Sequence, residues 1–516
     1  GYGYKSEYSL TGNCLDLELS GRADGYNPHK NRLEEIKTHR GDVSRIRPHQ
    51  QALHRAQLRA YGALLCRQEN RKSVELALVY YDIGRDKETL LTETAKADEL
   101  WQELETLCGL YKAWAEQEEH HREQRDALLA NLRFPFPDFR PRQRQLAETV
   151  YKNSVKAGTL LLEAPTGLGK TLGTLFPALM AMPAARQDRL FYLTCRNTAR
   201  QLALDAVDKL QHAQDELQPW PLRTLELVSK DDACEHPDKA CHGDSCPLAK
   251  GFFDRLPDAR AEAVQSKEPL TQETLANIAA GHDICPYFLA QEMVRWSDLV
   301  IGDVNRLFDQ SALLHGLIRQ NHWQASVLVD EAHNLVDRAR GMYSVQLEQQ
   351  RLLKLKKTAP KPVKAALDRT ARAWQALIRD HGEQAQPVFL PILPSQLLGA
   401  LQAMVSVITD YLADNPPDLA LQEVMFESVA FMKLADSFGD HSLCEFQRSG
   451  RGRASLTIQN LIPADFLIER FKAAHSVLLF SATLSPGVYY RDLLGLPEDA
   501  RFTSLPSPFS AGQLKV

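Results

Sequence analysis

The stretch TLLLEAPTGLGKT, residues 159–171, decides the fold, because it joins a buried-looking strand to a glycine-rich turn and then to a helix. In that context successive backbone N–H groups and the helix N-terminus bind phosphate groups. Lys170 would reach the β and γ phosphates of ATP, and the Thr171 hydroxyl would bind Mg2+. The other residues expected around the phosphates are Ala164, Pro165, Thr166, Gly167, Leu168 and Gly169, with Ala164 in place of the usual first glycine. A tight turn without function is the alternative.

Four further apolar runs follow this stretch, at residues 190–194, 299–304, 326–331 and 476–483. Helical patterns separate them. Continuous apolar strands alternating with helices are typical of a parallel sheet covered on both faces. The sequence therefore predicts an α/β core with two long insertions, one bearing cysteines and one mostly helical.

Paired acids end one of these runs, in VLVDEAHN at residues 327–334. Acids at the end of a buried strand are expensive unless they hold a metal or a water molecule. Asp330 suits Mg2+, and Glu331 suits the catalytic base that orients an attacking water. The alternative is a pair that caps a strand-to-helix turn.

Composition places few bounds on function. The 516 residues carry a net charge of −5, with 44% hydrophobic and 25% charged residues, as in ordinary soluble proteins. No run approaches the length of a membrane helix, so we expect no membrane contact. Nine unevenly spread cysteines indicate a reducing cytoplasm. A nucleic-acid site would need local basic clusters such as Lys354, Lys356, Lys357, Lys361 and Lys364.

Four cysteines gather in one insertion, within CEHPDKACHGDSC at residues 234–246 and DICPYF at residues 283–288. Structural zinc prefers tight C-x2-4-C pairs, and only the Cys241–Cys246 gap comes near that spacing. The looser arrangement of Cys234, Cys241, Cys246 and Cys285, with proline after two of them, suits a 4Fe-4S cluster better. Zinc and four unrelated buried thiols are the alternatives. We expect the remaining five cysteines to be small buried hydrophobes.

The three motifs EAPTGLGKT, DEAHN and SATLSP (residues 481–486) resemble, in this order, the XPD/DinG-like branch of superfamily 2 DNA helicases. The resemblance covers roughly residues 134–516. It implies a RecA-like motor domain, a 4Fe-4S cluster on the four cysteines, and a helical arch over single-stranded DNA. It also implies that Gln143 contacts adenine, that residues 193–201 touch the DNA strand, and that Ser481 and Thr483 couple hydrolysis to motion. An RNA helicase is an alternative that the cysteine insertion disfavours.

A second charged pattern precedes the motor, in ADGYNPHKNRLEEIKT at residues 23–38. In a strand, Glu35 and Lys37 point the same way, and Asp24 can meet Glu35 across a hairpin. Two carboxylates can hold Mg2+ or Mn2+, and Lys37 can orient the attacking water. Alone, the pattern is explained equally well by a salt-bridged hairpin.

Gln57 and Tyr61 lie four residues apart on one face of a predicted helix. Together with Asp24, Glu35 and Lys37, they resemble PD-(D/E)xK nucleases of the RecB-like type, which implies a restriction-endonuclease-like α/β fold. In that family the Gln and Tyr help to position DNA near the metal. Such nucleases begin with a helix that bears a further metal ligand, which we expect upstream of Gly1.

These patterns predict an α/β multidomain protein. The boundaries we expect are a nuclease-like domain at 1–98, a helical linker at 99–133, an iron-sulfur domain at 230–296, an arch-like insertion at 338–454, and a motor domain formed by 134–229, 297–337 and 455–516. Because the sequence ends soon after SATLSP, where such helicases continue into a second motor domain, we expect these residues to bind ATP but to turn it over poorly.

The first hypothesis is an ATP-dependent DNA helicase with a metal-dependent nuclease module, acting on single-stranded or forked DNA in repair or processing. In the second hypothesis the N-terminal unit is a non-catalytic DNA-binding domain. The pattern of residues leaves protein partners, polarity and pathway open.

Overall fold

A computed structural model describes residues 3–214, 220–381, 386–449 and 453–507. The remaining parts of the predicted domains, among them residues 508–516 of the motor, lie outside the described residues. The chain forms two compact units. One comprises residues 1–122 with 406–416, and the other comprises residues 123–405 with 417–516.

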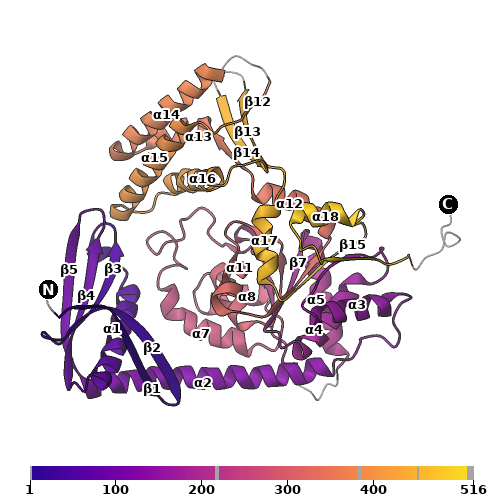
Figure 1. Cartoon of the computed structure of the whole chain (residues 1–516), viewed down its shortest axis with the longest axis horizontal. Helices are drawn as coiled ribbons and strands as arrows, with labels where there is room; N and C mark the ends of the chain where they lie inside the picture. The colour runs from indigo at the N-terminus through magenta and orange to yellow at the C-terminus, as the bar shows by residue number, and fades with distance from the viewer. Residues whose placement is uncertain (1–2, 215–219, 382–385, 450–452, 508–516) are drawn as a thin grey trace. The chain divides into compact units, whose positions relative to one another are not determined.

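The N-terminal unit is built on a five-stranded sheet in the order β1-β2-β3-β4-β5 (Figure 1). Strands β1 (Lys5–Cys14), β2 (Leu17–Asn27) and β3 (Arg32–His39) form an antiparallel meander. After the short 3-10 helix η1 (Val43–Arg45), helix α1 (Pro48–Gln68) crosses over to β4 (Ser73–Asp82), which pairs parallel to β3. Strand β5 (Lys87–Lys96) closes the sheet antiparallel to β4.

One buried core holds this unit together. The inward residues of the sheet pack against Leu58 and Leu65 of α1 and against Leu100 and Leu104 of α2 (Ala97–Ala130). Cys14, Cys66 and Cys108 lie in the same core, while Cys195 and Cys444 are buried in the other unit. The prediction that these five cysteines are buried is thereby confirmed.

The larger unit is built on a seven-stranded sheet in the order β16-β6-β15-β10-β7-β9-β8, and every neighbouring pair is parallel. The strands are β6 (Thr159–Glu163), β7 (Arg189–Thr194), β8 (Thr224–Leu227), β9 (Leu299–Asp303), β10 (Ala325–Asp330), β15 (Ser476–Ser481) and β16 (Arg501–Ser504). The five apolar runs of the sequence thus form strands of one parallel sheet, as predicted. The two outermost strands, β8 and β16, were not predicted.

Helices cover both faces of this sheet. On one face, α3 (Gln143–Val155), α4 (Lys170–Ala184) and α5 (Asn197–His212) share a core with alternate strand residues such as Leu162, Tyr192 and Phe480. Figure 1 shows α11 (Leu313–Asn321) and α17 (Ala464–Ala473) on the opposite side. The remaining short elements are α10 (Asn305–Phe308), 3-10 helix η3 (Ala332–Asn334), α12 (Leu335–Met342) and α18 (Gly487–Leu494).

The cysteine-bearing insertion between β8 and β9 is helical. It contains α6 (Lys230–Ala233), α7 (Phe252–Gln265), α8 (Gln272–Gly281), α9 (Pro286–Met293) and the 3-10 helix η2 (Val294–Trp296). The cysteines lie in the loop after α6 and at the start of α9.

The second insertion differs in part from the mostly helical segment that the sequence predicts. Its helices are α13 (Gln349–Thr358), α14 (Lys361–His381), α15 (Ser395–Asp414) and α16 (Leu419–Asp436). A four-stranded antiparallel sheet accompanies them, in the order β11-β14-β13-β12. Its strands are β11 (Val345–Glu348), β12 (Val388–Leu390), β13 (Ser442–Ser449) and β14 (Arg453–Asn460).

Helix α15 is the one described helix that is long and apolar enough to cross a membrane, judged by length and composition only. Core helices of water-soluble proteins pass the same test. In its first half, Leu397, Leu401 and Met404 are buried, and the Thr370 hydroxyl of α14 donates a hydrogen bond to the Ala400 carbonyl. These contacts account for the apolar residues of its first half as packing within the insertion.

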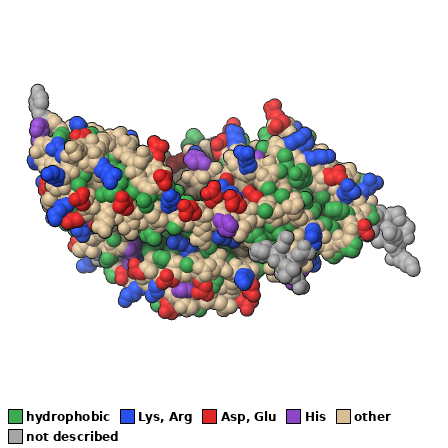
Figure 2. All heavy atoms as spheres, turned by 90° about the horizontal axis from the view of Figure 1, so that it is seen from below, with side chains coloured by type: hydrophobic (Ala, Val, Ile, Leu, Met, Phe, Trp, Pro, Cys, Tyr) green, Lys and Arg blue, Asp and Glu red, His purple; other side chains and the backbone are tan. Residues whose placement is uncertain are grey.

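Charged side chains of both signs are interspersed on the face of the molecule shown in Figure 2. This agrees with the net charge of −5. DNA binding would therefore depend on local groups of cations.

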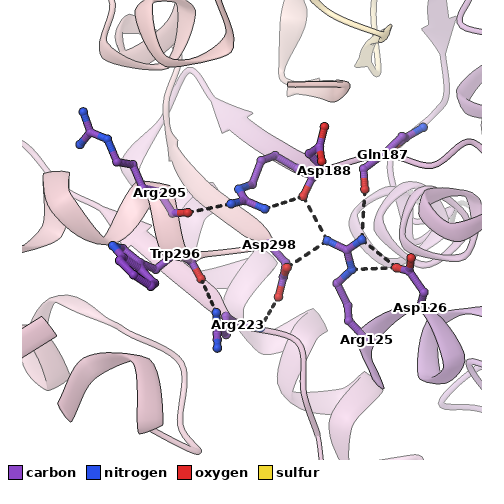
Figure 3. A network of polar contacts seen from close by, with 9 residues as sticks. Arg125, Asp126, Gln187, Asp188, Arg223, Arg295, Trp296 and Asp298 are labelled. Carbon is purple, nitrogen blue, oxygen red and sulfur yellow. Dashed lines mark hydrogen bonds and ion pairs between the residues drawn. The ribbon is translucent and has the colours of Figure 1, made fainter. Parts of the chain in front are cut away.

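A buried arginine anchors the end of α2 in the larger unit (Figure 3). Arg125 is only 1% exposed. Its guanidinium donates to the Asp298 carboxylate at 3.0 Å, to the Asp126 carboxylate at 2.8 Å, and to the carbonyls of Gln187 and Asp188 at 3.1 Å each. Asp298 also accepts a hydrogen bond from the Arg223 backbone N–H. The charge is therefore fully paired, and it ties α2 to the loops that precede β7 and β9.

Replacing Arg125 with methionine should lower the free energy of unfolding of this unit by about 3–5 kcal/mol, because the buried Asp298 carboxylate would lose the opposite charge of the guanidinium. Denaturant unfolding measures the change. A matched control is Arg144→Met, which breaks an ion pair with Glu148 whose side chains are 78% and 55% exposed. It should change stability by less than about 0.5 kcal/mol. Equal effects of the two substitutions would contradict the anchoring role of Arg125.

Candidate functional site

Parallel pairing brings three motifs to the carboxyl-terminal edge of the seven-stranded sheet. The carboxyl ends of β6, β15, β10 and β7 are neighbours, with Ser481 opposite Glu163, and Asp330 opposite both Phe480 and Thr194. The phosphate loop follows β6, SATLSP begins at the end of β15, and DEAHN begins at the end of β10. Ligands of open parallel sheets bind at this edge.

The phosphate loop has the backbone that its glycines permit. Gly167 and Gly169 adopt φ angles of 84° and 77°, which only glycine takes without strain. Leu168 is buried beneath the loop, and Lys170 begins α4. The Ala164 N–H donates to the Ser481 carbonyl at 2.8 Å. Pro165 is half-buried and Thr166 is exposed, so this part of the loop, just before α4, faces solvent.

Gln143 lies directly under this loop. Its side chain is 3% exposed, its Oε1 accepts from the Arg140 backbone N–H at 3.0 Å, and its Nε2 donates to the Gly169 carbonyl at 3.2 Å. A β-carbon on Gly169 would lie 2.5 Å from that Nε2. The amide therefore supports the loop. The contact with adenine stays a prediction.

Asp330 is held at both carboxylate oxygens. Its Oδ1 accepts from the Glu331 N–H, and its Oδ2 accepts from the Tyr192 hydroxyl, each at 2.8 Å. Burial raises the pKa of Asp330, and the nearby charge of Lys170 opposes that rise. The Thr171 side chain lies close to the same tyrosine hydroxyl. The predicted Mg2+ ligands Thr171 and Asp330 thus both lie beside Tyr192, which sequence reasoning missed because an aromatic residue in an apolar run is typical of the core.

Glu331 takes part in a second group of contacts with His333 and Ser481. Glu331 adopts a left-handed backbone, with φ of 52°. His333 Nδ1 lies 2.6 Å from Ser481 Oγ and 3.2 Å from Glu331 Oε2, and Ser481 Oγ donates to Glu331 Oε2 at 3.4 Å. The predicted base and the predicted coupling residue are therefore in direct contact. His333 was missed, although the DEAH motif contains it.

Glu163 and Thr483 complete this edge. The Glu163 carboxylate accepts from the Leu484 N–H at 2.8 Å and from the Ser504 hydroxyl at 2.9 Å. Thr483, the second predicted coupling residue, is exposed. The sheet edge thus connects the strand before the phosphate loop to SATLSP.

The four predicted cluster ligands, Cys234, Cys241, Cys246 and Cys285, line one pocket. Lys230, His236 and Lys239 line it too. Burial raises the pKa of the Cys285 thiol, which the charges of Cys234 and Cys241 raise further. The nearby Cys241 thiol raises the pKa of Lys230. The folded chain therefore brings all four thiols together from segments about forty residues apart.

Four of the five predicted residues in the N-terminal unit form one chain of side-chain contacts, and the fifth, Asp24, lies beside it. Asp24 Oδ2 accepts from the Ile36 N–H at 2.6 Å, beside Glu35. Lys37 Nζ donates to Glu35 Oε1 at 2.7 Å and to Gln57 Oε1 at 3.1 Å. Gln57 Nε2 donates to the Tyr61 hydroxyl at 3.2 Å. Glu35 and Lys37 lie on the same side of β3, and Gln57 and Tyr61 on one face of α1, as the strand and helix periods predict. Asp24 bonds the Ile36 backbone instead of the Glu35 side chain.

Glu35 has the burial of a functional acid rather than of a surface ion pair. It is 3% exposed, and its Oε2 has no hydrogen-bond partner in the described part of the chain. Burial raises the pKa of Glu35, while Lys37 lowers it and Asp24 raises it. His54, another residue that sequence reasoning missed, lies with Nδ1 3.0 Å from the Tyr80 hydroxyl. Burial and the charge of Lys37 lower the pKa of His54.

The residues predicted to contact DNA lie in two further places. Residues 193–201 run from the end of β7 into α5, with Arg196 and Thr198 exposed. Lys356 forms an ion pair with Asp368, while the other four lysines of the basic cluster are exposed. Among the described residues, no three His, Cys, Asp or Glu side chains are grouped closely enough to hold a single metal ion.

The family model described as DEAD_2 matches residues 209–352. This segment contains the four-cysteine pocket, Asp330 and Glu331. This part of the chain is thus similar to the DEAD_2 family, which agrees with the resemblance to XPD-type helicases. The match does not extend to the N-terminal unit.

Curated relatives agree with that match. The "General transcription and DNA repair factor IIH helicase subunit XPD" of Dictyostelium discoideum is 24% identical over 231 residues, covering 39% of this chain and 29% of the relative. A "Regulator of telomere elongation helicase 1 homolog" of Anopheles gambiae is 24% identical over 253 residues, covering 40% and 25%. The chain therefore spans under a third of the length of these relatives.

Among solved structures, one described as an XPD helicase is similar to 72% of this chain and 63% of its own, with a TM-score of 0.47 and 16% identity.

Proposed function

We propose that this chain belongs to an ATP-dependent DNA helicase or translocase of the XPD/DinG-like branch, with a metal-dependent nuclease module, acting on single-stranded or forked DNA in repair or processing. The observation that carries the motor assignment is the meeting of Lys170, Asp330 and Glu331 at one sheet edge, beside the phosphate loop. Nine free cysteines agree with a reducing compartment such as the cytoplasm.

In the motor, each residue has a separate task. The loop N–H groups and Lys170 bind the phosphates, and the Thr171 hydroxyl and Asp330 carboxylate would hold Mg2+. Bound Mg2+ neutralises charge that develops on the phosphates. Glu331 orients the attacking water. Its contact with Ser481 through His333 gives a route from the nucleotide to SATLSP.

The cysteine pocket fits a 4Fe-4S cluster. Around one zinc ion, four sulfurs at about 2.3 Å from the metal would lie within about 4 Å of one another. The four thiols line one pocket, and their loose spacing in the sequence suits a cubane cluster better than the tight pairs that zinc prefers. The cluster would be held by Cys234, Cys241, Cys246 and Cys285. It would cross-link the insertion into a small domain. With the helices of the second insertion, this domain would form an arch over single-stranded DNA.

In the N-terminal unit, Asp24 and Glu35 would hold Mg2+ or Mn2+. A metal ion bound there lowers the pKa of a water molecule into the nucleophilic range. Lys37 orients that water and offsets negative charge that develops on the phosphate. Gln57 positions Lys37, and Tyr61 positions Gln57. The alternative, a non-catalytic DNA-binding domain, accounts for the same contacts as a structural ion pair.

The motor assignment predicts that Lys170→Ala weakens ATP binding by about 10–100-fold, because a hydrogen bond to a charged group contributes about 1.5–3 kcal/mol. Titration of a fluorescent ATP analogue with the full chain measures the change. Lys156→Ala, which removes an exposed lysine at the end of α3, serves as the control and should bind normally. Wild-type protein that binds no ATP would refute the assignment.

The nuclease assignment predicts Mg2+- or Mn2+-dependent degradation of labelled single-stranded DNA. Glu35→Ala and Lys37→Ala should each reduce its rate by at least about 100-fold, because each removes a group that stabilises the transition state. Glu34→Gln, one residue away, should retain activity. Cleavage unaffected by both substitutions would remove this assignment and favour the DNA-binding alternative.

The cluster assignment predicts a brown protein that contains iron and sulfide. Cys285→Ser should lose the broad visible absorbance and most of the iron, because a cubane cluster needs four ligands. Cys444→Ser changes a buried cysteine outside the pocket and should keep both. Anaerobically prepared protein that is colourless and holds stoichiometric zinc would contradict the cluster.

A further inference from the structure

Tyr192 lies in the middle of the nucleotide site, although no motif of the sequence assigns it a function. It belongs to β7, and its side chain is completely buried. The ring packs edge-on against Phe480 of β15, with 6.1 Å between ring centroids. The hydroxyl donates to Asp330 Oδ2 at 2.8 Å. A phenol in this strand therefore reaches across to the acid at the end of the neighbouring strand.

The side chain of Thr171, the first residue after Lys170 in the phosphate loop, lies close to the same hydroxyl. Since the other oxygen of Asp330 accepts from the Glu331 N–H, the tyrosine completes the fixed orientation of this carboxylate. Tyr192 of β7 is thus hydrogen-bonded to Asp330 of β10 and adjacent to Thr171 of α4.

The chemistry of the three groups determines which of them donates each hydrogen bond. An ionised carboxylate only accepts hydrogen bonds, so Tyr192 donates its proton to Asp330. The phenol oxygen is then free to accept the proton of Thr171. The lone pairs of the Thr171 hydroxyl then stay available for a cation. So do the lone pairs of the Asp330 carboxylate that accept no hydrogen bond.

We propose that Tyr192 is a positioning residue, which holds Asp330 and Thr171 in the orientation that binds Mg2+ and so makes the pocket prefer the Mg2+ complex of the nucleotide. The inference rests on the proposed function, and it deepens the account of that same site. In metal sites, partners that orient the ligands typically affect metal affinity by about 10–100-fold. A phenol that only filled space would have no such effect.

The test compares the full wild-type chain with Tyr192→Phe, which keeps the ring and removes the hydroxyl. Binding of a fluorescent ATP analogue is titrated at a series of Mg2+ concentrations and also in EDTA. We expect the Mg2+ concentration for half-maximal binding to rise at least about 10-fold. Binding in EDTA should stay unchanged, because the loop N–H groups and Lys170 are untouched.

Tyr343→Phe is the matched control. Tyr343 is a buried tyrosine of the same unit, and its hydroxyl donates to the Phe308 carbonyl. Its loss should lower stability to a similar extent and leave the Mg2+ dependence as in the wild type. An equal shift in both variants would mean that Tyr192 has only a structural role, and would overturn the proposal.

A double-mutant cycle with Asp330→Asn keeps the test decisive if Tyr192→Phe alone is unstable. Without the Tyr192 hydroxyl the Asp330 carboxylate lacks one hydrogen-bond donor, and the Asp330→Asn substitution removes that negative charge. If Tyr192 acts through Asp330, the double variant should need nearly the same Mg2+ concentration as Asp330→Asn alone. Independent, multiplicative losses would overturn the proposal. If the wild type binds no ATP with or without Mg2+, the proposed motor function fails first, so the two failures are distinguishable.

Discussion

The parallel pairing of β6, β15, β10 and β7 is the constraint on which the nucleotide site depends. Parallel strands end at the same edge of a sheet, and the register places Glu163 opposite Ser481, and Asp330 opposite Thr194. Residues more than 300 positions apart in the sequence thereby come within hydrogen-bond distance. Both long insertions connect one strand of the sheet to another. Their length and structure can therefore vary without moving this edge.

Glu163 shows how the same edge can join nucleotide binding to a second element. Its carboxylate binds the Leu484 N–H and the Ser504 hydroxyl, while the residue after it starts the phosphate loop. Any displacement of the phosphate loop on binding phosphate would be transmitted to SATLSP through these contacts of Glu163. His333 provides a parallel connection from Glu331 to Ser481. Two short paths, one from each side of the phosphate site, therefore converge on the end of β15.

The sequence predicted features that local geometry determines. The apolar runs became strands because both faces of the sheet are covered, and Glu35, Lys37, Gln57 and Tyr61 met because strand and helix periods align them. Features set by tertiary contacts were missed. Tyr192 looks like an ordinary core residue until β10 lies beside it, and Arg125 looks like one more charge in an acidic helix until Asp298 pairs with it. The alternating segments at β13 and β14 were overlooked inside an insertion dominated by helices.

The two units place their acids in a similar physical situation. Glu35 and Asp330 are both buried at strands, burial raises the pKa of each, and a lysine opposes that rise in each case. An acid whose pKa is raised in the folded state lowers stability as pH increases from its unfolded pKa through its folded pKa. Ionising either acid in the folded chain therefore costs stability. A bound divalent cation would reverse that effect, since it stabilises the ionised form. Both acids are buried, at 3% and 5% exposure, whereas most ion pairs of the chain are exposed, and this burial is a physical argument that both positions serve a ligand.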